Sequence, residues 1–413
     1  MLRVLRRGPR PLAPGPVRMS TVQGVRLSTT AAGIRYRGRD DLLLIELAEG
    51  GSCAAVFTRN AFCAAPVTVA REHLAKGPVR YLLINSGNAN AGTGAAGLRA
   101  ARETCRLLAG MAGCAMSQVL PFSTGVIGVD LPVNPFSQSI PALLKGLSED
   151  NWRPAAAAIM TTDTVSKLVS REVGLSGGAV TVTGIAKGSG MICPDMATML
   201  AYVATDASVP QPLLQEMLRD AVEQSFNAIT VDGDTSTNDA CVLLASGSAK
   251  VAIDSLASDD GRALSQAVQS VCAELAEMIV RDGEGATKLV RVRVASAASD
   301  GEARRVAYTV AHSPLVKTAL FASDPNWGRI LAAVGRAGVD GLDIDRIRIW
   351  LGDVCIVSGG GRDPGYTEEA GQAVMAAEEI VIRIDLDRGE SKVQVLTCDL
   401  SYDYVKINAE YRT

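Results

Sequence analysis

The segment from Lys187 to Leu200 most constrains how this chain can fold, because a glycine-rich, turn-prone stretch runs directly into an apolar one. Residues 187–191 (KGSGM) predict a tight loop, and residues 199–204 (MLAYVA) predict a buried strand. The step Ala197-Thr198 stands at their junction. An ordinary strand threonine would explain this step taken alone.

A break of the chain before Thr198 would give the step a chemical meaning. A threonine hydroxyl is a weak nucleophile unless a base lies beside it. A freed α-amine supplies that base, because its ordinary pKa of about 7.7–8.0 lies near the working pH at which general bases are most effective. The chain has only two histidines, His73 and His312, as conventional bases.

Composition limits the remaining classes of function. The length of 413 residues suggests two to three domains, and the net charge of −3 argues against a nucleic-acid surface. The nine cysteines are scattered and form no C-x-x-C pair, which is typical of reduced thiols in an intracellular protein. We therefore expect no metal and no cofactor. No apolar run approaches the roughly 20 residues of a membrane span.

The N-terminal region differs from the rest of the chain. Residues 1–39 contain nine arginines and no acidic residue, and the first acid is Asp40. Arginine-rich, acid-free leaders are typical of organelle import. We therefore expect residues 1–21 to be a mitochondrial transit peptide, with a mature start near Val22 and a location in the mitochondrial matrix. The alternative is a disordered basic tail of a bacterial protein.

Strand and helix patterns mix along the rest of the chain. Strands are expected at residues 42–47, 81–85, 180–185, 198–204, 289–294, 346–351, 380–386 and 392–396, and helices at residues 95–108, from Pro210 onward and at 264–281. Ser208 is expected to cap the second helix, and the turn Arg388-Gly389 to join the last two strands as a hairpin. This mixture predicts an α/β (α+β) fold or a layered sandwich.

Nine short segments follow one another in an order that one known family shares. They are residues 31–34 (AAGI), 56–60 (VFTRN), 84–91 (INSGNANA), 123–128 (STGVIG), 160–164 (MTTDT), 229–239 (ITVDGDTSTND), 282–288 (DGEGATK), 323–329 (SDPNWGR) and 407–413 (INAEYRT). Together with residues 187–200 they resemble the ornithine acetyltransferase (ArgJ) family of arginine biosynthesis. The match spans nearly the whole chain after the leader.

The resemblance implies an architecture and a processing step. The fold would be a layered αββα-type sandwich, shared with self-cleaving aminopeptidases, with a smaller C-terminal α/β domain. Cleavage at Ala197-Thr198 would give an alpha chain, residues 22–197, and a beta chain, residues 198–413. Residues 198–245 would complete the catalytic domain, 246–395 would form the smaller domain, and 396–413 would return to the active site. The chains would assemble as a dimer of heterodimers.

The resemblance also implies roles for individual residues. Thr198 would be the nucleophile, and the Thr124 hydroxyl and Gly125 N–H would form the oxyanion hole, whose donors stabilise the tetrahedral intermediate. Substrate contacts would come from Thr164, Lys187, Thr198, Glu284, Asn408 and Thr413. Lys187 suits a carboxylate and Glu284 an ammonium group. Thr161 or Thr162 could replace Thr164 in this role.

The implied reaction is a ping-pong acetyl transfer. Thr198 would take acetyl from N-acetylornithine, and glutamate would accept it as N-acetylglutamate. Some members of the family also use acetyl-CoA as donor, and no residue set here decides that point. No nucleic-acid or membrane partner is expected. Three positions depart from the family pattern: Cys193, Asp195 and Ala228.

Three alternatives remain at this point. A self-cleaving aminopeptidase or amidase of the same architecture would hydrolyse amino-acid amides without transferring acetyl. A serine hydrolase is suggested by residues 174–178 (GLSGG), which match G-x-S-x-G, with His312 downstream. That motif requires a strand before it and a helix after it. A non-enzymatic protein that keeps the fold is the third alternative.

Overall fold

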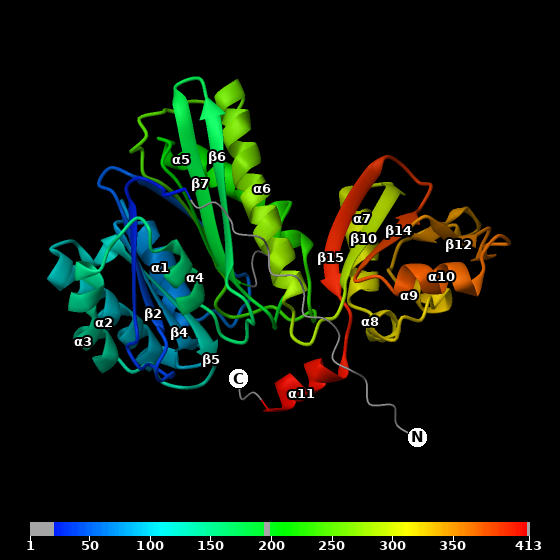
Figure 1. The fold of residues 1–413 in the computed structure, drawn as a ribbon, viewed down its shortest axis with the longest axis horizontal. Helices are drawn as coiled ribbons and strands as arrows, with labels where there is room; N and C mark the ends of the chain where they lie inside the picture. Colours follow the sequence, from blue (N-terminus) through cyan, green and yellow to red (C-terminus); the bar gives the residue numbers. More distant parts are fainter. Residues whose placement is uncertain (1–19, 194–198, 411–413) are drawn as a thin grey trace.

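The computed structural model describes residues 20–193 and 199–410. Its larger unit stacks two β-sheets face to face (Figure 1). The four-stranded sheet has the order β1 (Val25–Thr30), β2 (Leu42–Leu47), β4 (Tyr81–Asn88), β5 (Val119–Val126). The five-stranded sheet has the order β3 (Ser52–Phe57), β9 (Ala240–Ala245), β8 (Leu200–Thr205), β7 (Gly178–Lys187), β6 (Lys167–Leu175).

Helices cover both outer faces of this pair of sheets. The four-stranded sheet packs on α1 (Ala65–Leu74), α2 (Gly94–Ala112) and α3 (Asn134–Lys145), and the five-stranded sheet packs on α5 (Gln211–Glu223) and α6 (Asp259–Arg281). The short helix α4 (Trp152–Ala158) contributes Trp152 to the core between the sheets. The predicted layered αββα sandwich is thus confirmed.

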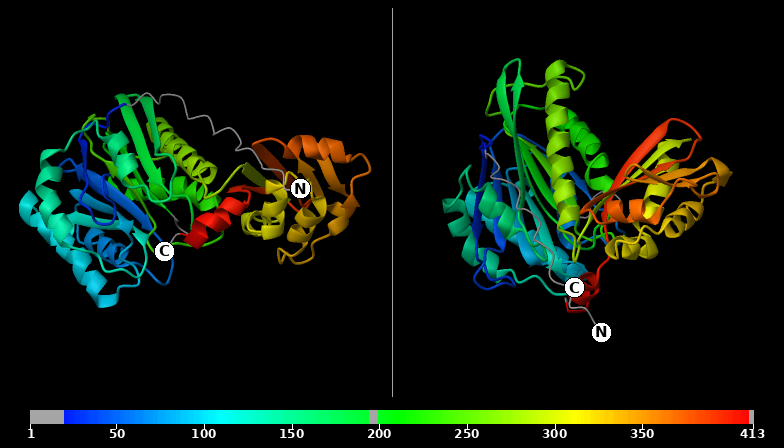
Figure 2. Two further views of the ribbon diagram at one scale, coloured as in Figure 1. Left: turned by 60° about the horizontal axis from the view of Figure 1, so that its bottom comes forward. Right: turned by 45° about the vertical axis from the view of Figure 1, so that its right-hand side comes forward.

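A smaller α/β unit lies beside the sandwich (Figure 2). Its six-stranded sheet has the order β13 (Gly361–Arg362), β12 (Val354–Ser358), β11 (Arg348–Leu351), β14 (Glu379–Asp385), β10 (Leu289–Ala297), β15 (Ser391–Cys398). Its helices are α7 (Asp300–Ala311), α8 (Pro314–Phe321), α9 (Trp327–Gly335) and α10 (Glu368–Met375). Across both units, the described residues also form three short 3₁₀ helices, which are η1 (Met116–Gln118), η2 (Phe226–Ala228) and η3 (Ile344–Arg346). The last helix, α11 (Tyr402–Glu410), runs between the two units.

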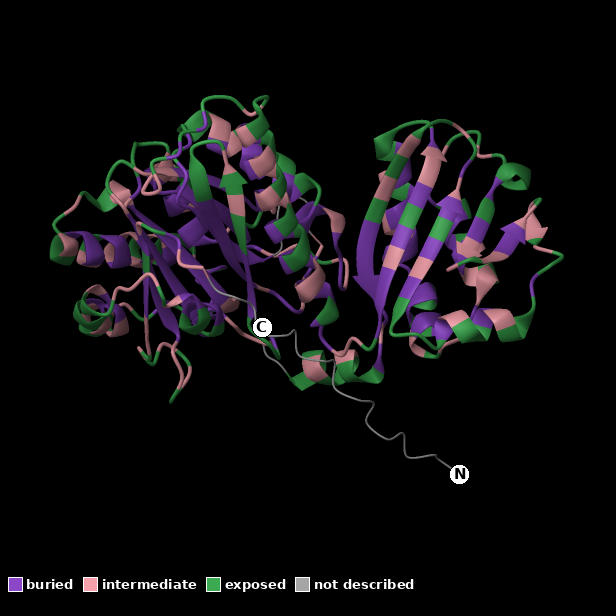
Figure 3. Cartoon of the chain, turned by 45° about the horizontal axis from the view of Figure 1, so that its top comes forward, coloured by how far each residue is buried: buried purple, intermediate pink, exposed green. Residues whose placement is uncertain are grey.

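Burial follows the layering (Figure 3). Strands β2, β8 and β9 are buried at every position, because both faces of their sheets are covered. In β14 buried and less buried residues alternate, since helices cover one face of the six-stranded sheet. No helix in the described ranges is long and apolar enough to cross a membrane.

Three sequence expectations about the fold are wrong. Helix α5 has Pro210 as its N-cap and no side-chain cap, while the backbone of Ser208 pairs with Val251 and Ile253. Strands β14 and β15 do not form a hairpin, because β10 lies between them, parallel to β14 and antiparallel to β15. Helix α6 packs on the five-stranded sheet rather than in the smaller unit, whose sheet begins only at Leu289.

The G-x-S-x-G match lacks the geometry of a nucleophile elbow. Ser176 and Gly177 form the turn between β6 and β7, so a strand follows the serine where a helix is required. The Ser176 hydroxyl donates to the Asp260 carboxylate at the surface. His312 follows α7 in the smaller unit. The serine hydrolase alternative therefore has no support.

Candidate active site

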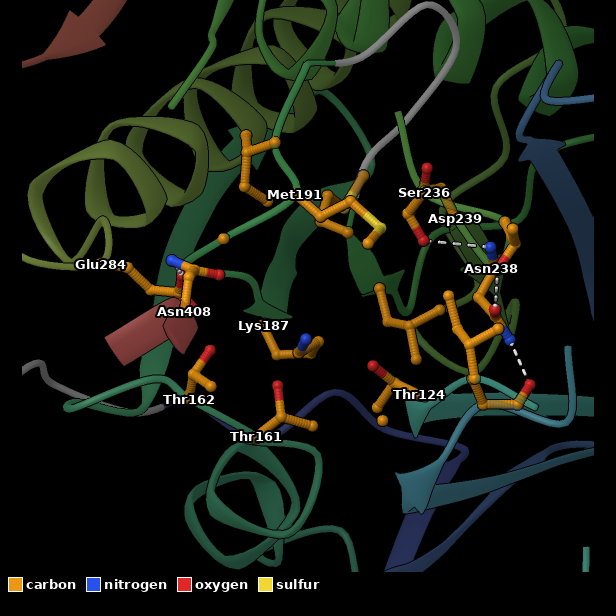
Figure 4. A pocket seen from close by; sticks show the side chains of 18 residues that line it. Thr124, Thr161, Thr162, Lys187, Met191, Ser236, Asn238, Asp239, Glu284 and Asn408 are labelled. Atoms are coloured by element: carbon orange, nitrogen blue, oxygen red, sulfur yellow. Dashed lines mark hydrogen bonds between the residues drawn. The ribbon is translucent and has the colours of Figure 1, made fainter. Parts of the chain in front are cut away.

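A cavity opens where the carboxyl end of β5 meets the end of β7 and the start of β8 (Figure 4). Lys187 lies between Thr124 on one side and Glu284 with Asn408 on the other. The polar and charged residues that line the cavity are Thr124, Thr161, Thr162, Lys187, Ser236, Thr237, Asn238, Asp239, Glu284 and Asn408. Segments far apart in the sequence therefore converge on one small space.

The predicted oxyanion-hole residues sit at the end of β5. Gly125 has φ +134°, a backbone conformation essentially reserved for glycine. A Cβ at this position would overlap the carbonyl carbon of Gly87 and lie 2.5 Å from the amide nitrogen of Asn88. Glycine thus lets β5 approach β4 closely at the cavity edge. The Thr124 side chain is buried and lines the same cavity.

Asn238 fixes this edge from the opposite sheet. Its Nδ2 donates to the carbonyl oxygens of Ala89 at 2.6 Å and Ser123 at 2.9 Å. Its Oδ1 accepts from the Thr237 hydroxyl at 2.6 Å. The loop before β9 is thereby tied to the residue that precedes Thr124. Sequence reasoning gave Asn238 no role, although it lies inside the recognised segment 229–239.

Opposite charges face each other across the cavity. Burial lowers the pKa of Lys187, and the acidic side chains of Asp163, Asp239 and Glu284 act in the opposite direction. Glu284 is 9% exposed, and its Oε2 accepts from Asn408 Nδ2 at 2.8 Å. A cation and an anion held this way suit a small molecule that carries both a carboxylate and an ammonium group.

Glycine also shapes the wall beside Glu284. A Cβ on Gly190 would overlap the Glu284 carboxylate, so a larger residue there would displace that carboxylate from its present position. The Glu284 N–H donates to the Ser189 carbonyl at 2.9 Å, which fixes the distance between the two loops.

Asp239 is the least expected group in the cavity wall. Its side chain is 3% exposed, and its Oδ2 has no hydrogen-bond partner among the described residues. Burial raises the pKa of Asp239 well above its usual value, against hydrogen bonds from Ser236 and the charge of Lys187. A buried carboxyl group with a raised pKa is a feature that clusters at functional sites. Nothing in the local sequence pattern distinguishes Asp239 from a turn acid.

The structure places Thr161 and Thr162, and not Thr164, on the cavity wall. Thr164 is exposed, and its hydroxyl and amide N–H both donate to the Asp282 carboxylate. The three threonines lie within four residues of one another, so their spacing in the sequence could not show which of them lines the cavity. Ala197, Thr198 and Thr413 lie outside the described residues, whereas Met199 and Leu200, which follow Thr198, line the cavity.

Two of the departures from the family pattern lie among described residues. Cys193 Sγ lies 3.4 Å from His312 Nε2, which is also 3.1 Å from the Thr230 hydroxyl. Ala228 ends η2 and lines a separate groove between the two units. Asp195 lies outside the described residues. Residues 20–193 and 199–410 contain no group of three His, Cys, Asp or Glu side chains placed to hold a metal ion.

The fold and this cavity define a class of protein: an αββα sandwich with a site at the sheet ends for a small molecule of mixed charge. Comparison with known proteins then gives the family. A sequence model of the ArgJ family matches residues 26–413, and the chain belongs to that family.

Several relatives match over nearly their full length. The arginine biosynthesis bifunctional protein ArgJ of Methylococcus capsulatus is 59% identical over 397 residues, which cover 96% of this chain and 97% of that protein. The protein of the same name from Pseudomonas syringae is 56% identical over 405 residues, covering 97% of this chain and 99% of that protein.

Crystal structures also match in part. The bifunctional protein argJ of Bacillus halodurans has 42% identity and a TM-score of 0.49, covering 52% of this chain and 100% of that chain. The ornithine acetyltransferase of Mycobacterium tuberculosis, solved with ornithine, has 35% identity and a TM-score of 0.40, covering 43% of this chain and 94% of that chain.

The prediction of a mitochondrial matrix enzyme is wrong. The relatives that match at 55–59% identity are proteins of the bacteria Methylococcus, Pseudomonas and Psychrobacter. A short basic, acid-free stretch has the composition of an import leader and equally that of a basic tail of a bacterial protein, so composition could not separate the two. Residues 1–19 of that stretch lie outside the described residues.

Proposed function

We propose that this protein is a self-cleaving N-acetyltransferase of arginine biosynthesis, which moves acetyl from N-acetylornithine to glutamate. One observation carries the proposal: Thr124, Lys187 and Glu284, which the resemblance assigns to the site, line a single cavity. Met199, the residue directly after the proposed nucleophile, lines it too. Membership of the ArgJ family favours this transferase over the aminopeptidase alternative.

The first chemical step is the break at Ala197-Thr198. The Thr198 hydroxyl attacks the Ala197 carbonyl, the C–N bond breaks as the ester forms, and the hydroxyl proton passes to the released nitrogen. Water then hydrolyses the ester. The products are an alpha chain that ends at Ala197 and a beta chain, residues 198–413, that begins with a free α-amine.

The second step is the transfer itself. The α-amine takes the Thr198 hydroxyl proton, the oxygen attacks the acetyl carbonyl of N-acetylornithine, and ornithine leaves with the proton. The amine of glutamate then attacks the carbonyl of acetyl-Thr198, the ester C–O bond breaks, the amine proton passes to the Thr198 oxygen, and N-acetylglutamate leaves. The Thr124 hydroxyl and Gly125 N–H stabilise the oxyanion in both halves, and each such donor contributes about 2.7–4 kcal/mol in comparable enzymes.

Substrate recognition uses the two charges in the cavity. Lys187 binds the α-carboxylate that N-acetylornithine and glutamate share. Glu284, held by Asn408, binds the side-chain ammonium of ornithine, and Thr161 or Thr162 supplies a hydroxyl contact. Thr413 would complete the site from the end of the chain. Two relatives are named bifunctional, which supports acetyl-CoA as a second donor; the reaction uses no other cofactor, and the paired chains assemble as a dimer of heterodimers.

Intact-mass measurement with N-terminal sequencing tests the proposal directly. We expect two fragments, one beginning Thr-Met-Leu-Ala, and a single chain for Thr198→Ala. Thr309→Ala is the matched control, because that threonine lies on α7 and its hydroxyl donates to the Arg305 carbonyl within the same helix. Acetyl transfer between ornithine and glutamate is then assayed. A wild-type chain that stays intact would refute the N-terminal-threonine mechanism.

A further inference from the structure

A buried group of three charges lies directly behind the cavity, and we call it the buried triad: Asp163, Lys167 and Asp282. Lys167 Nζ is 2.7 Å from Asp163 Oδ1 and 2.6 Å from Asp282 Oδ2. The side chains of Asp163 and Lys167 are 0% exposed and that of Asp282 is 6% exposed. None of the three lines the cavity.

The two acids of the buried triad hold different parts of the cavity wall. Asp163 accepts from the Gly188 N–H at 2.7 Å and from the Thr161 N–H at 3.0 Å. It therefore fixes the residue after Lys187 and the threonine that faces Lys187. Figure 4 shows the side chain of Thr161 directed toward Lys187.

The other acid holds the opposite wall. Asp282 lies two residues before Glu284, and its backbone carbonyl accepts from the Ser189 hydroxyl at 2.6 Å. The Glu284 N–H donates to the Ser189 carbonyl at 2.9 Å. Through Lys167, the loop after β7 and the loop after α6 thus share one set of buried hydrogen bonds.

Stability does not account for this arrangement. Burying three charges costs several kcal/mol per ion, and apolar replacements of buried ion pairs are often neutral or stabilising. Against the effect of burial, the ammonium groups of Lys167 and Lys187 hold the pKa of Asp163 well below its usual range. Asp163 is therefore an anion beside Lys187 at neutral pH.

We propose that the buried triad is a positioning unit that keeps Lys187 a cation and holds it at a fixed distance from Glu284, so that the site selects donors with an α-carboxylate. The inference rests on the proposed function for its substrate. The titratable groups that face Lys187 are Asp163, Lys167, Asp239 and Glu284. Asp163 is the strongest of the four, so removing its charge affects Lys187 most.

The central test is Asp163→Asn, with KM and kcat for N-acetylornithine measured from pH 6 to pH 10. Loss of the anion lowers the pKa of Lys187 further, so KM should rise at a lower pH than in the wild type. We expect KM to be about tenfold higher on the alkaline side, equivalent to one pKa unit, with kcat at saturation changed much less. For the methyl ester of the donor, which lacks the carboxylate, the KM values of variant and wild type should agree.

Glu274→Gln is the matched control, because it breaks an exposed ion pair with Arg171 on the outer side of the sandwich. This variant should leave the pH dependence of KM and of kcat unchanged. Equal KM–pH profiles for wild type and Asp163→Asn, or an equal KM increase for the methyl ester, would overturn the inference.

A second measurement separates this inference from the proposed function. The pH dependence of acetylation of Lys187 by acetic anhydride, followed by peptide mass spectrometry, reports its pKa without any enzyme activity. Asp163→Asn should shift that profile to lower pH, and an unshifted profile would contradict the inference even if acetyl transfer occurs. If Asp163→Asn does not fold, the triple change Asp163→Asn, Lys167→Met and Asp282→Asn removes all three buried charges together. Lys167 lowers the pKa of Lys187 by less than Asp163 raises it, so the profile should shift in the same direction by a smaller amount.

Discussion

Removal of the Asn238 side chain should damage both the stability and the chemistry of the protein. Asn238 makes three side-chain hydrogen bonds, to the carbonyls of Ala89 and Ser123 and with the hydroxyl of Thr237. Each such bond contributes a net of about 0.5–1.5 kcal/mol. We therefore expect Asn238→Ala to lower the free energy of unfolding by about 2–4 kcal/mol, which urea unfolding would measure.

The chemical effect follows from the position of the lost bonds. Asn238 holds the carbonyl of Ser123, the residue before Thr124, so its removal frees the proposed oxyanion donor to move. Loss of one oxyanion donor costs about 10²–10³ in kcat. Displacement of a donor that is still present should cost less, on the order of tenfold to hundredfold in kcat, with a smaller change in KM.

Asn151→Ala is the matched control for this change. Asn151 also donates through Nδ2 to two carbonyls, Leu27 at 2.8 Å and Gly146 at 3.1 Å, but it is partly exposed and does not line the cavity. Its loss should cost less stability and leave acetyl transfer unchanged. The reasoning is refuted if Asn238→Ala has wild-type kcat, or if both variants lose activity to the same extent.

Two further changes test other parts of the site. Gly125→Ala places a side chain at φ +134° against Gly87 and Asn88, so it should cost at least about 1–3 kcal/mol and abolish transfer; wild-type stability in urea would contradict this. Asp239 keeps its proton in the folded chain at pH values where the unfolded chain has lost it, so its contribution to stability falls as pH rises through the unfolded value near 3.9. Asp239→Asn should therefore gain stability relative to wild type as pH rises above about 4, and a stability difference that does not change with pH would argue against a raised pKa.

Sequence reasoning succeeded where local pattern and global packing agree. Strands such as β2 and β8 are uniformly apolar because sheets and helices cover them on both sides, so their sequences predict buried strands. Helix α6 was expected from its apolar spacing over residues 264–281, and the structure extends it from Asp259 to Arg281. The local sequence of each of these elements is therefore enough to predict it.

The errors arise where a partner is distant in the chain. The turn at Arg388-Gly389 suggested a local hairpin, but β10, about a hundred residues earlier, inserts between the two strands. The spacing within α6 gives an apolar face without saying which sheet covers it. Asn238 and Ala89 are 149 residues apart, and no local pattern links them. The same holds for Asp282 and Thr164, whose contact removes Thr164 from the cavity.

The distribution of the site along the chain bears on how a cleaved protein would hold together. A break before Thr198 would leave Thr124 and Lys187 on one chain and Asp239, Glu284 and Asn408 on the other, so neither chain alone would contain the site. The strands on either side of that step, β7 and β8, pair with each other from Lys187↔Leu200 to Val182↔Thr205. Strand β8 also pairs with β9 on its far side and is buried at every position. Separating the two chains would therefore expose the core of the sandwich to water, which the hydrophobic effect strongly opposes. A single broken peptide bond then leaves the cavity walls in place and changes only the chemistry at the start of β8.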